Sequence, residues 1–367
     1  MTSFVVQGWC PGALRPMMSG DGLVMRVRPR MGRLTAAQAR GLARAAAAHG
    51  SGLIDLSARA NIQLRGVQPG SHLALLDELS ALGLLDASEM VERHRNIIVS
   101  PFWDGTGWES LHAAAAGVLA ESEFANLPSK FGVALDVAAP MVLRSSSADV
   151  RFEHHPQGIL VRPDGFHTGR LTQSAAEAGD AFRELLRWFQ PRGIHQGRGR
   201  MAALSGQIMP EGFDQPMSPE IHVPRPGPHP IGFLAGFEFG QLSAETLTEL
   251  ANSAIRITPW RMILLEGQGA PSLPGLITSP LDPRLNVTAC TGAPGCPQGL
   301  QPTRDLARRL SPQVRPGQHL HVSGCAKGCA HHAPAAITLT ATAQGFTLIR
   351  NGRAQDQGVS FTSDRLY

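Results

Sequence analysis

The chain contains very little lysine, few cysteines and no long hydrophobic segment. Of its 33 basic residues, only Lys130 and Lys327 are lysines. No apolar run approaches the roughly 20 residues that a membrane-spanning helix needs. The opening MTSFVVQGWCPG lacks the basic and apolar blocks of a secretory signal. We therefore expect a cytoplasmic protein with no membrane partner.

The charge of the chain is modest and argues against one class of function. The net charge is +4 and no block of basic residues stands out, so nucleic-acid binding is not expected. The preference for arginine over lysine has two interpretations, and the sequence leaves both open. One is codon usage in a GC-rich genome, and the other is the two-point recognition of carboxylates that a guanidinium performs.

Four of the five cysteines lie close together, in CTGAPGC (290–296) and CAKGC (325–329). Clustered cysteines in a reducing compartment indicate metal or redox chemistry, not a disulfide framework. Four thiolates flanked by glycines suit a [4Fe-4S] cluster, whereas structural zinc usually uses closer Cys-x2–4-Cys pairs. We predict a cluster, with zinc as the competing interpretation, and expect Cys10 to be a small buried residue. The predicted ligands are Cys290, Cys296, Cys325 and Cys329.

An internal repeat predicts the architecture. Residues 23–66 and 232–267 each contain a strand, a Gly-x-Leu-Ser/Thr-Ala helix start, an amphipathic helix and a second strand that ends in glycine. Thr35 and Gln38 form a capping-box pattern, and Ser243 opens the second helix in the same way. The pattern indicates an α+β protein built by duplication, with pseudo-twofold symmetry.

A weaker similarity links RNIIVSP (95–101) to LNVTACTG (285–292). Between the repeats, apolar spacing predicts helices over 111–122 and 173–189, and strands over 130–137 and 158–165. The Pro- and Gly-rich stretch 223–232 is expected to be a linker. Residues 337–349 are expected to form a terminal hairpin.

The cysteine signature, with Asn286 before it and Ser323-Gly324 before the third cysteine, resembles the sulfite/nitrite reductase superfamily. LSARANIQLRG (56–66) resembles the Thr-x-Arg-x-x-x-Gln strand of that superfamily. RNIIVSP (95–101) and LPSKFGVA (127–134) resemble its other tetrapyrrole-pocket motifs. This resemblance covers essentially the whole chain. It implies duplicated ferredoxin-like half-domains with two α/β lobes, and a sirohaem bridged to the cluster by the residue that matches Cys329.

The resemblance also implies a division into four parts. A first ferredoxin-like half-repeat with an N-terminal arm covers residues 1–90, and a central α/β lobe of the tetrapyrrole pocket covers 91–225. A second half-repeat covers 226–280, and an α/β lobe for the iron–sulfur cluster covers 281–367.

One departure from the reductases redirects the functional prediction. In their Leu-Pro-x-Lys-Phe-Lys segment the second lysine is here Gly132, so only Lys130 remains for a small anion. The segments 9–29 and 257–261 instead resemble the monooxygenases of aerobic cobalamin biosynthesis within the superfamily. That resemblance implies O2-dependent hydroxylation of precorrin-3A with closure of a γ-lactone, and a mononuclear non-haem iron besides the [4Fe-4S] cluster.

An external NAD(P)H-linked electron donor is expected, because the sequence has no GxGxxG unit that would bind the nicotinamide nucleotide itself. Two alternatives remain open at this point. The first is a sirohaem-dependent nitrite or sulfite reductase, and the second is a non-catalytic electron carrier or iron–sulfur sensor.

A tetrapyrrole carries a rim of carboxylates, which charged donors bind more strongly than neutral ones. Arg26 and Arg28 share one face of a strand because alternate residues do. The residues expected to bind the tetrapyrrole are Arg26, Arg28, Arg59, Asn61, Gln63, Arg95 and Lys130. Non-haem iron oxygenases often use two histidines and one carboxylate. The ligand set and the catalytic residues stay open, and the candidate iron ligands are His331, His332 and His195.

Overall fold

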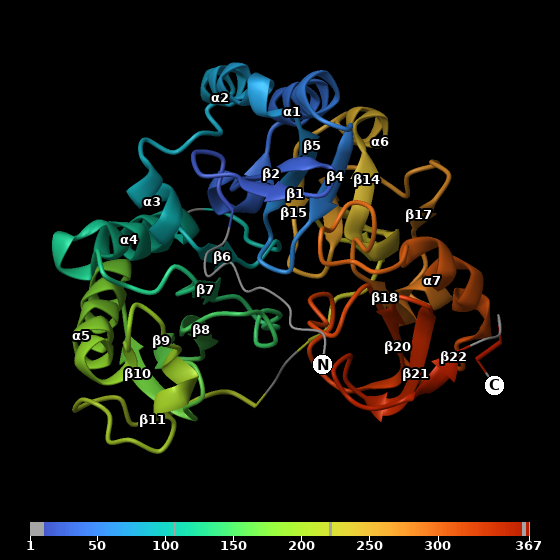
Figure 1. Cartoon of the computed structure of the whole chain (residues 1–367). Coiled ribbons are helices and arrows are strands. Elements are labelled where there is room, and N and C mark those ends of the chain that lie inside the picture. The colour runs from blue at the N-terminus through green and yellow to red at the C-terminus, as the bar shows by residue number, and fades with distance from the viewer. Residues whose placement is uncertain (1–10, 106, 220–221, 362–364, 367) are drawn as a thin grey trace.

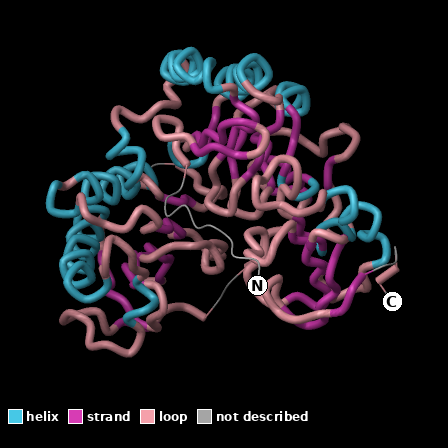
Figure 2. Tube along the Cα trace, in the orientation of Figure 1, coloured by secondary structure: helices cyan, strands magenta, loops and turns pink. Residues whose placement is uncertain are grey.

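The computed structural model describes residues 11–105, 107–219, 222–361 and 365–366. Four sheets organise the chain, one in each of the two repeats and one in each of two further lobes. Helices α1, α2 and α6 lie on the side of the repeats that faces away from the lobes (Figure 1). Figure 2 shows the strands of the repeats directly beneath these helices.

The first repeat forms a sheet with the strand order β1-β2-β5-β4-β14. Helix α1 begins at the predicted capping box, since Thr35 Oγ1 accepts from the Gln38 amide and Gln38 Oε1 accepts from the Thr35 amide. Its alanine-rich face is buried, which anchors it on the sheet. The elements are β1 (Met17–Ser19), β2 (Gly22–Val27), β3 (Arg33–Leu34), α1 (Ala36–His49), β4 (Leu53–Leu56), β5 (Ile62–Val67) and α2 (His72–Ala81).

The second repeat forms a sheet with the strand order β12-β13-β16-β15-β3, and β17 also pairs with β13. Ser243 caps its helix as predicted, because the side chain accepts from the Thr246 amide. The elements are β12 (Gly227–His229), β13 (Gly232–Phe237), β14 (Gln241–Ser243), α6 (Ala244–Leu250), β15 (Ile255–Ile257), β16 (Met262–Glu266) and β17 (Leu276–Ile277).

Each repeat gives one short strand to the sheet of the other. β3 of the first repeat pairs with β15, and β14 of the second repeat pairs with β4. Met31 and Phe239, just before these exchanged strands, share the left-handed backbone conformation (φ 53° and 55°), and each precedes a left-handed glycine. This reciprocal exchange produces the predicted pseudo-twofold arrangement and confirms the α+β fold class.

The central lobe has the strand order β11-β10-β9-β8-β7-β6. β6, β7 and β8 run parallel, and β9 to β11 are antiparallel. The two predicted helices correspond to α4 and α5, which pack against each other. The elements are α3 (Glu89–His94), β6 (Ile97–Val99), α4 (Trp108–Ala120), β7 (Val133–Asp136), β8 (Val150–His155), β9 (Gly158–Pro163), β10 (Thr168–Thr172), α5 (Ala175–Gly193) and β11 (Gln215–Pro216).

The last lobe, called the cluster lobe below, has the strand order β18-β19-β20-β21-β22 and the same switch from parallel to antiparallel pairing after its third strand. At the end of β6, Ser100 N donates to Leu135 O at 2.9 Å. At the end of β18, Cys290 N donates to Val322 O at 3.3 Å. The elements are β18 (Val287–Ala289), α7 (Arg304–Leu310), β19 (Leu320–Ser323), β20 (Ala335–Thr342), β21 (Gly345–Gly352) and β22 (Val359–Phe361). The two lobes are therefore a second duplicated pair, and Ser100 occupies the position of Cys290.

Two sequence predictions need correction. The stretch 223–232 is more than a linker, because it contributes β12 to the second sheet. The hairpin of β20 and β21 is not terminal, because β22 adds a further strand. The four-part division of the chain remains a proposal, and Cys10 lies outside the described residues. None of the helices in the described ranges combines the length and apolar character needed to cross a membrane.

Candidate cluster and ligand site

Two loops at one edge of the cluster lobe carry the four predicted cysteines. Cys290 directly follows β18, and Cys325 lies two residues beyond β19. Because β18 and β19 are parallel neighbours, the loops that follow them leave the same edge of the sheet. Cys290, Cys296 and Cys325 are half-buried, Cys329 is exposed, and all four are free thiols.

The four thiols lie close enough to influence one another electrostatically. Burial raises the pKa of Cys325 above its ordinary value, and the charges of Cys290 and Cys296 add to the rise against the lowering by Lys327. Burial likewise raises the pKa of Cys329, which is coupled to the other three cysteines. Crowded thiolates disfavour one another's charge, so this arrangement is suited to a positively charged metal centre.

A glycine brings the two cysteine loops into contact. Gly324 N donates to Cys290 Sγ at 3.1 Å, and a Cβ at this glycine would lie 3.0 Å from Gly292 Cα. Backbone N–H groups that point at ligand sulfurs tune the potential of an iron–sulfur cluster. Thr303 Oγ1 donates to the Cys290 carbonyl at 2.6 Å and fixes the first loop from its other side.

The donor set fits an iron–sulfur cluster better than a single ion. Within the described ranges, no group of three or more His, Cys, Asp or Glu side chains is placed to hold one metal ion. Structural zinc usually takes its cysteines from closer Cys-x2–4-Cys pairs, whereas five residues separate Cys290 from Cys296. A [4Fe-4S] cluster takes one thiolate at each of its four irons, which matches the four thiols that the two loops supply.

Two buried arginines lie at the end of β2 in the adjoining first repeat, Arg26 within the strand and Arg28 directly after it, so the prediction that both lie on one strand is wrong for Arg28. Arg26 on β2 is 8% exposed and Arg28 is 6% exposed. Arg26 Nη2 donates to Gln63 Oε1 at 2.9 Å, but Nε and Nη1 have no hydrogen-bond partner among the described residues. Arg28 Nη1 lies 3.5 Å from Glu92 Oε1 without hydrogen-bond geometry. Burial, with repulsion from Arg26, lowers the pKa of Arg28 to about 10.

Unused buried donors on charged groups cost free energy. Two such guanidinium groups side by side repel each other as well, and the carboxylates of Glu92 and Asp86 compensate this repulsion at Arg28 only in part. An anionic ligand would accept hydrogen bonds from the unused donors and would also offset the repulsion between the two guanidinium groups. This face is therefore suited to carboxylates.

A second group of cations lies where the first repeat meets the central lobe. Arg59 Nη2 donates to the Lys130 carbonyl at 3.2 Å and to Ser147 Oγ at 3.3 Å. Arg200 Nη2 donates to the same hydroxyl at 3.3 Å. The Lys130 side chain is exposed. Together these three cations form a basic rim that is suited to the carboxylates of a ligand.

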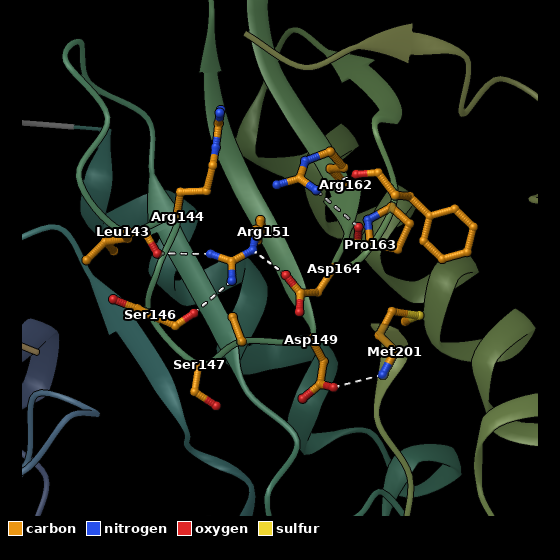
Figure 3. A network of polar contacts seen from close by, with 12 residues as sticks. Leu143, Arg144, Ser146, Ser147, Asp149, Arg151, Arg162, Pro163, Asp164 and Met201 are labelled. Atoms are coloured by element: carbon orange, nitrogen blue, oxygen red, sulfur yellow. Dashed lines mark hydrogen bonds and ion pairs between the residues drawn. The ribbon is translucent and has the colours of Figure 1, made fainter. Parts of the chain in front are cut away.

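Figure 3 shows how a buried arginine holds the loop that carries Ser147. Arg151 of β8 donates to the Leu143 carbonyl at 2.9 Å, to the Ser146 carbonyl at 2.7 Å and to Asp164 Oδ1 at 2.8 Å. A single guanidinium thereby ties the two carbonyls of the loop to a carboxylate, which gives Ser147 a fixed backbone.

Asp149 fixes the neighbouring segments of the basic rim (Figure 3). This fully buried carboxylate accepts from Gly132 N at 3.0 Å, from Met201 N at 2.9 Å and from Arg200 Nε at 2.8 Å. Burial raises its pKa, and the charge of Arg200 opposes the rise. Asp149 therefore holds the segment that follows Lys130 and the segment that carries Arg200 in one relative position.

The other predicted ligand residues have different surroundings. Gln63 is half-buried and orients Arg26. Asn61 is buried, and its backbone N–H donates to Ser57 Oγ at 3.1 Å. Arg95 makes a two-point ion pair with Asp86, at 2.7 and 3.0 Å, and donates to the Arg28 carbonyl at 2.7 Å. Arg95 thus contributes to packing, and its role as a ligand residue stays a prediction.

The predicted iron-ligand histidines have different surroundings, and their role stays a prediction. The ring of His331 is centred 4.6 Å from that of His319 and 5.5 Å from that of His321. His332 is exposed, and His195 forms a backbone bridge with Arg198 just beyond α5. Burial lowers the pKa of His321 to about 3. The part of the chain that the structure describes offers no three-ligand group for a mononuclear iron.

Sequence reasoning missed the carboxylates that organise the site. Asp149 stands in SSSADVR, which has no recognisable motif. Glu92 accepts from Ala13 N at 2.5 Å and from Leu14 N at 3.2 Å, which fastens this segment beside Arg28. No spacing rule connects Glu92 to residues so far away in the sequence.

Comparison with known proteins agrees with this geometry. The profile of the nitrite/sulfite reductase ferredoxin-like half domain matches residues 15–82. The structure of the NirA protein of Mycobacterium tuberculosis superposes with a TM-score of 0.60, covering 89% of this chain and 74% of its own, at 20% identity. The chain has the nitrite/sulfite reductase fold.

Two curated relatives narrow the comparison. A precorrin-3B synthase of Sinorhizobium sp is 28% identical, over 98% of this chain and 86% of its own length. A ferredoxin–nitrite reductase of Synechococcus elongatus is 26% identical, over 78% of this chain and 69% of its own length. The resemblance predicted from the sequence is confirmed, and the similarity to precorrin-3B synthase extends over more of the nitrite/sulfite reductase-like chain.

Proposed function

We propose that the protein is an O2-dependent tetrapyrrole monooxygenase of the precorrin-3B synthase type. In this proposal it hydroxylates precorrin-3A and closes a γ-lactone from a ring acetate, as a step of aerobic cobalamin biosynthesis. One oxygen atom of O2 enters the product, and the other leaves as water after two electrons and two protons are supplied. The similarity to a precorrin-3B synthase over nearly the whole chain supports this reading.

The observation that carries the proposal is the incompletely paired arginines Arg26 and Arg28, within and directly after β2 of the repeat that contacts the first cysteine loop. The acetate and propionate groups of a tetrapyrrole provide the missing acceptors, and guanidinium–carboxylate contacts are stronger than neutral ones. Gln63 orients Arg26 from the next strand. Arg59 and Lys130 are suited to carboxylates at the other edge of the macrocycle, with Asn61 completing the predicted set.

The four cysteines would hold a [4Fe-4S] cluster, which supplies single-electron transfer. In the protein, Gly324 N–H tunes the environment of Cys290, and Lys327 lowers the pKa of Cys325 and Cys329. Electrons come from an external NAD(P)H-linked donor. The mononuclear iron of the resemblance has no ligand set among the described residues, so no step is assigned to it.

A sirohaem-dependent nitrite or sulfite reductase is the second candidate. The exposed thiol of Cys329 is suited to a shared ligand position, and one relative is named a nitrite reductase. Gly132 argues against it, because a second lysine for a small anion is missing there.

The test is an anaerobic purification followed by absorption spectroscopy, metal analysis and turnover. We expect four irons with matching sulfide per chain, no sirohaem bands, and conversion of precorrin-3A to a product that carries one isotope-labelled oxygen from O2. Strong sirohaem bands together with nitrite or sulfite reduction would establish the second candidate. Turnover of precorrin-3A without O2 would exclude the monooxygenase reaction.

A further inference from the structure

We infer that Arg65 is a positioning residue that fastens the first cysteine loop to the ligand-bearing sheet, and that its buried charge raises the reduction potential of the cluster. The inference rests on the cluster assignment in the proposed function. It is independent of which tetrapyrrole the sheet binds.

Three donors from the first repeat converge on one carbonyl of the cysteine loop. Gly295 O, one residue before Cys296, accepts from Ser19 Oγ at 2.7 Å, from Arg65 Nη2 at 2.9 Å and from Gly20 N at 3.2 Å. The approach is so close that a Cβ on Gly20 would lie 2.1 Å from the Pro294 carbonyl oxygen. The turn between β1 and β2 is therefore seated directly on the loop that carries the cluster ligand.

Arg65 is the charged centre of this contact. Its side chain is 7% exposed and makes a two-point ion pair with Asp21, at 3.0 and 3.1 Å. Asp55 lies 3.7 Å from Arg65 Nε and also accepts from Arg304 at 3.3 Å. Arg304 opens α7, which follows the first cysteine loop. One guanidinium thus joins β5, the β1–β2 turn and the cluster lobe.

The position of Arg65 on β5 links the cluster to the ligand. Gln63 and Arg65 lie on the same face of the strand, about 7 Å apart along it. Gln63 contacts Arg26 on the carboxylate-binding side, and Arg65 contacts the cysteine loop. One strand, β5, therefore sets the distance between the carboxylate-binding side and the first cysteine loop. Electron transfer between a cluster and a bound substrate requires this distance to be constant.

The charge of Arg65 has a definite electrostatic effect. Reduction adds a negative charge to a centre already bound by four thiolates, and a nearby buried cation stabilises the more negative state. Removal of the cation also leaves Asp21 without its ion-pair partner and Asp55 with Arg304 as its remaining cation, which shifts the potential in the same direction. Loss of Arg65 therefore lowers the reduction potential.

Two substitutions separate the geometric role from the charge. Arg65→Met removes both, and we expect a lower midpoint potential in an EPR-monitored redox titration. Arg65→Lys keeps the positive charge but loses the two-point contacts of the guanidinium, so we expect a cluster reduction potential near the wild-type value. The Arg65→Lys variant should lose its cluster to an iron chelator about 10-fold faster than wild type. This is the scale of effect seen when a residue that orients a metal ligand is replaced. Ser19→Ala, which removes one donor to Gly295 O and no charge, should resemble Arg65→Lys in smaller measure.

Arg151→Met is the matched control. Arg151 is also a buried arginine that ties loop carbonyls to a carboxylate, but in the central lobe (Figure 3). Arg151→Met should lower the unfolding free energy about as much as Arg65→Met does. It should leave the reduction potential of the cluster and the rate of cluster loss to the chelator unchanged. A potential in Arg65→Met equal to that of wild type, or an equal shift in Arg151→Met, would overturn the inference. Failure of the cluster assignment itself is a different result, since the wild-type protein would then contain no cluster.

Discussion

Arg26 and Gln63 form a cross-strand pair on β2 and β5, and the equivalent pair on β13 and β16 consists of Leu234 and Leu264. In the second repeat these leucines and Met262 form a buried apolar cluster, against which Phe102 and Trp260 pack. The backbone arrangement is shared by both copies, so the face that we propose for anion binding depends on the side chains of the first copy. Among the described residues, the pair in the first repeat has unused guanidinium donors, whereas the equivalent pair in the second repeat is apolar.

The two lobes differ in the same way. Ser100 stands at the position of Cys290, and in the central lobe Asp136 ends β7 as Ser323 ends β19 in the cluster lobe. Asp136 accepts from Val142 N at 2.8 Å and from Leu143 N at 2.6 Å, which closes its loop around a carboxylate. Ser100 lines a cavity of about 430 Å³ together with the stacked rings of Phe102 and His229.

The largest expected effect comes from removing the cysteine that distinguishes the cluster lobe from the central lobe. Cys290→Ala removes one of the four proposed cluster ligands, so cluster iron and its absorbance should fall to roughly a tenth or less of wild type. Ser100→Ala makes the same change at the equivalent position of the other lobe and should leave the iron content unaltered. Anaerobic iron and sulfide analysis of both variants measures the difference. Equal iron in the two variants would remove Cys290 from the ligand set.

The second expected effect comes from giving the second repeat the charge of the first. Leu234→Arg places a guanidinium among buried apolar side chains, beside a cavity that Asp104 also lines. Burial of its charge should cost about 3–5 kcal/mol of unfolding free energy. Leu234→Met is the control, because it conserves volume and should cost less than about 1.5 kcal/mol. Urea unfolding measures both. A fully stable Leu234→Arg variant would show that the second sheet face is open to solvent or to an anion.

The reverse change should separate function from stability. Arg26→Leu removes a buried charge with unused donors, so stability should stay equal or rise, because apolar replacement of buried charge is often neutral or favourable. Binding of a tetrapyrrole polycarboxylate should weaken about 10- to 100-fold, which corresponds to one lost charge-assisted contact. Arg40→Leu, on α1 of the same repeat, is the binding control. Unchanged affinity in Arg26→Leu, measured by fluorescence quenching, would move the ligand off this face.

The sequence predicts the repeat and the cysteine centre because both depend on local patterns. Thr35 and Ser243 start helices through contacts three residues away, and the cysteines cluster within two short segments. The exchange of β3 and β14 is not predictable, because strands of two or three residues carry no periodic signal.

The sequence also does not predict polar contacts between residues that lie far apart along the chain. Arg65 finds the carbonyl of Gly295, 230 positions away, and a backbone acceptor leaves no trace in the amino-acid pattern. Arg95 matches a pocket motif, yet its guanidinium makes a two-point ion pair with Asp86. Motifs therefore identify which residues are placed near the pocket, whereas packing decides which of them keep a donor available.

The smallest expected effect tests the loop-closing carboxylate of the central lobe through pH. Burial raises the pKa of Asp136 from 3.8 to about 6, against the two amide hydrogen bonds that lower it. The folded state therefore holds a proton that the unfolded state has released, and this stabilisation is complete below pH 3.8 and lost as the pH rises through about 6. Asp136→Asn keeps an acceptor for the amides and cannot titrate.

The destabilisation caused by Asp136→Asn should therefore be greater at about pH 5 than at about pH 7.5, by about 1 kcal/mol. Asp180→Asn is the control, because it replaces an exposed carboxylate on α5 and so measures pH effects that are unrelated to burial. Urea unfolding of wild type and both variants at the two pH values gives the comparison. A pH-independent difference for Asp136→Asn would mean that this carboxylate stays ionised in the folded protein. The two lobes would then differ in ligand chemistry at Ser100 and Cys290 but not in the protonation of their loop-closing side chains.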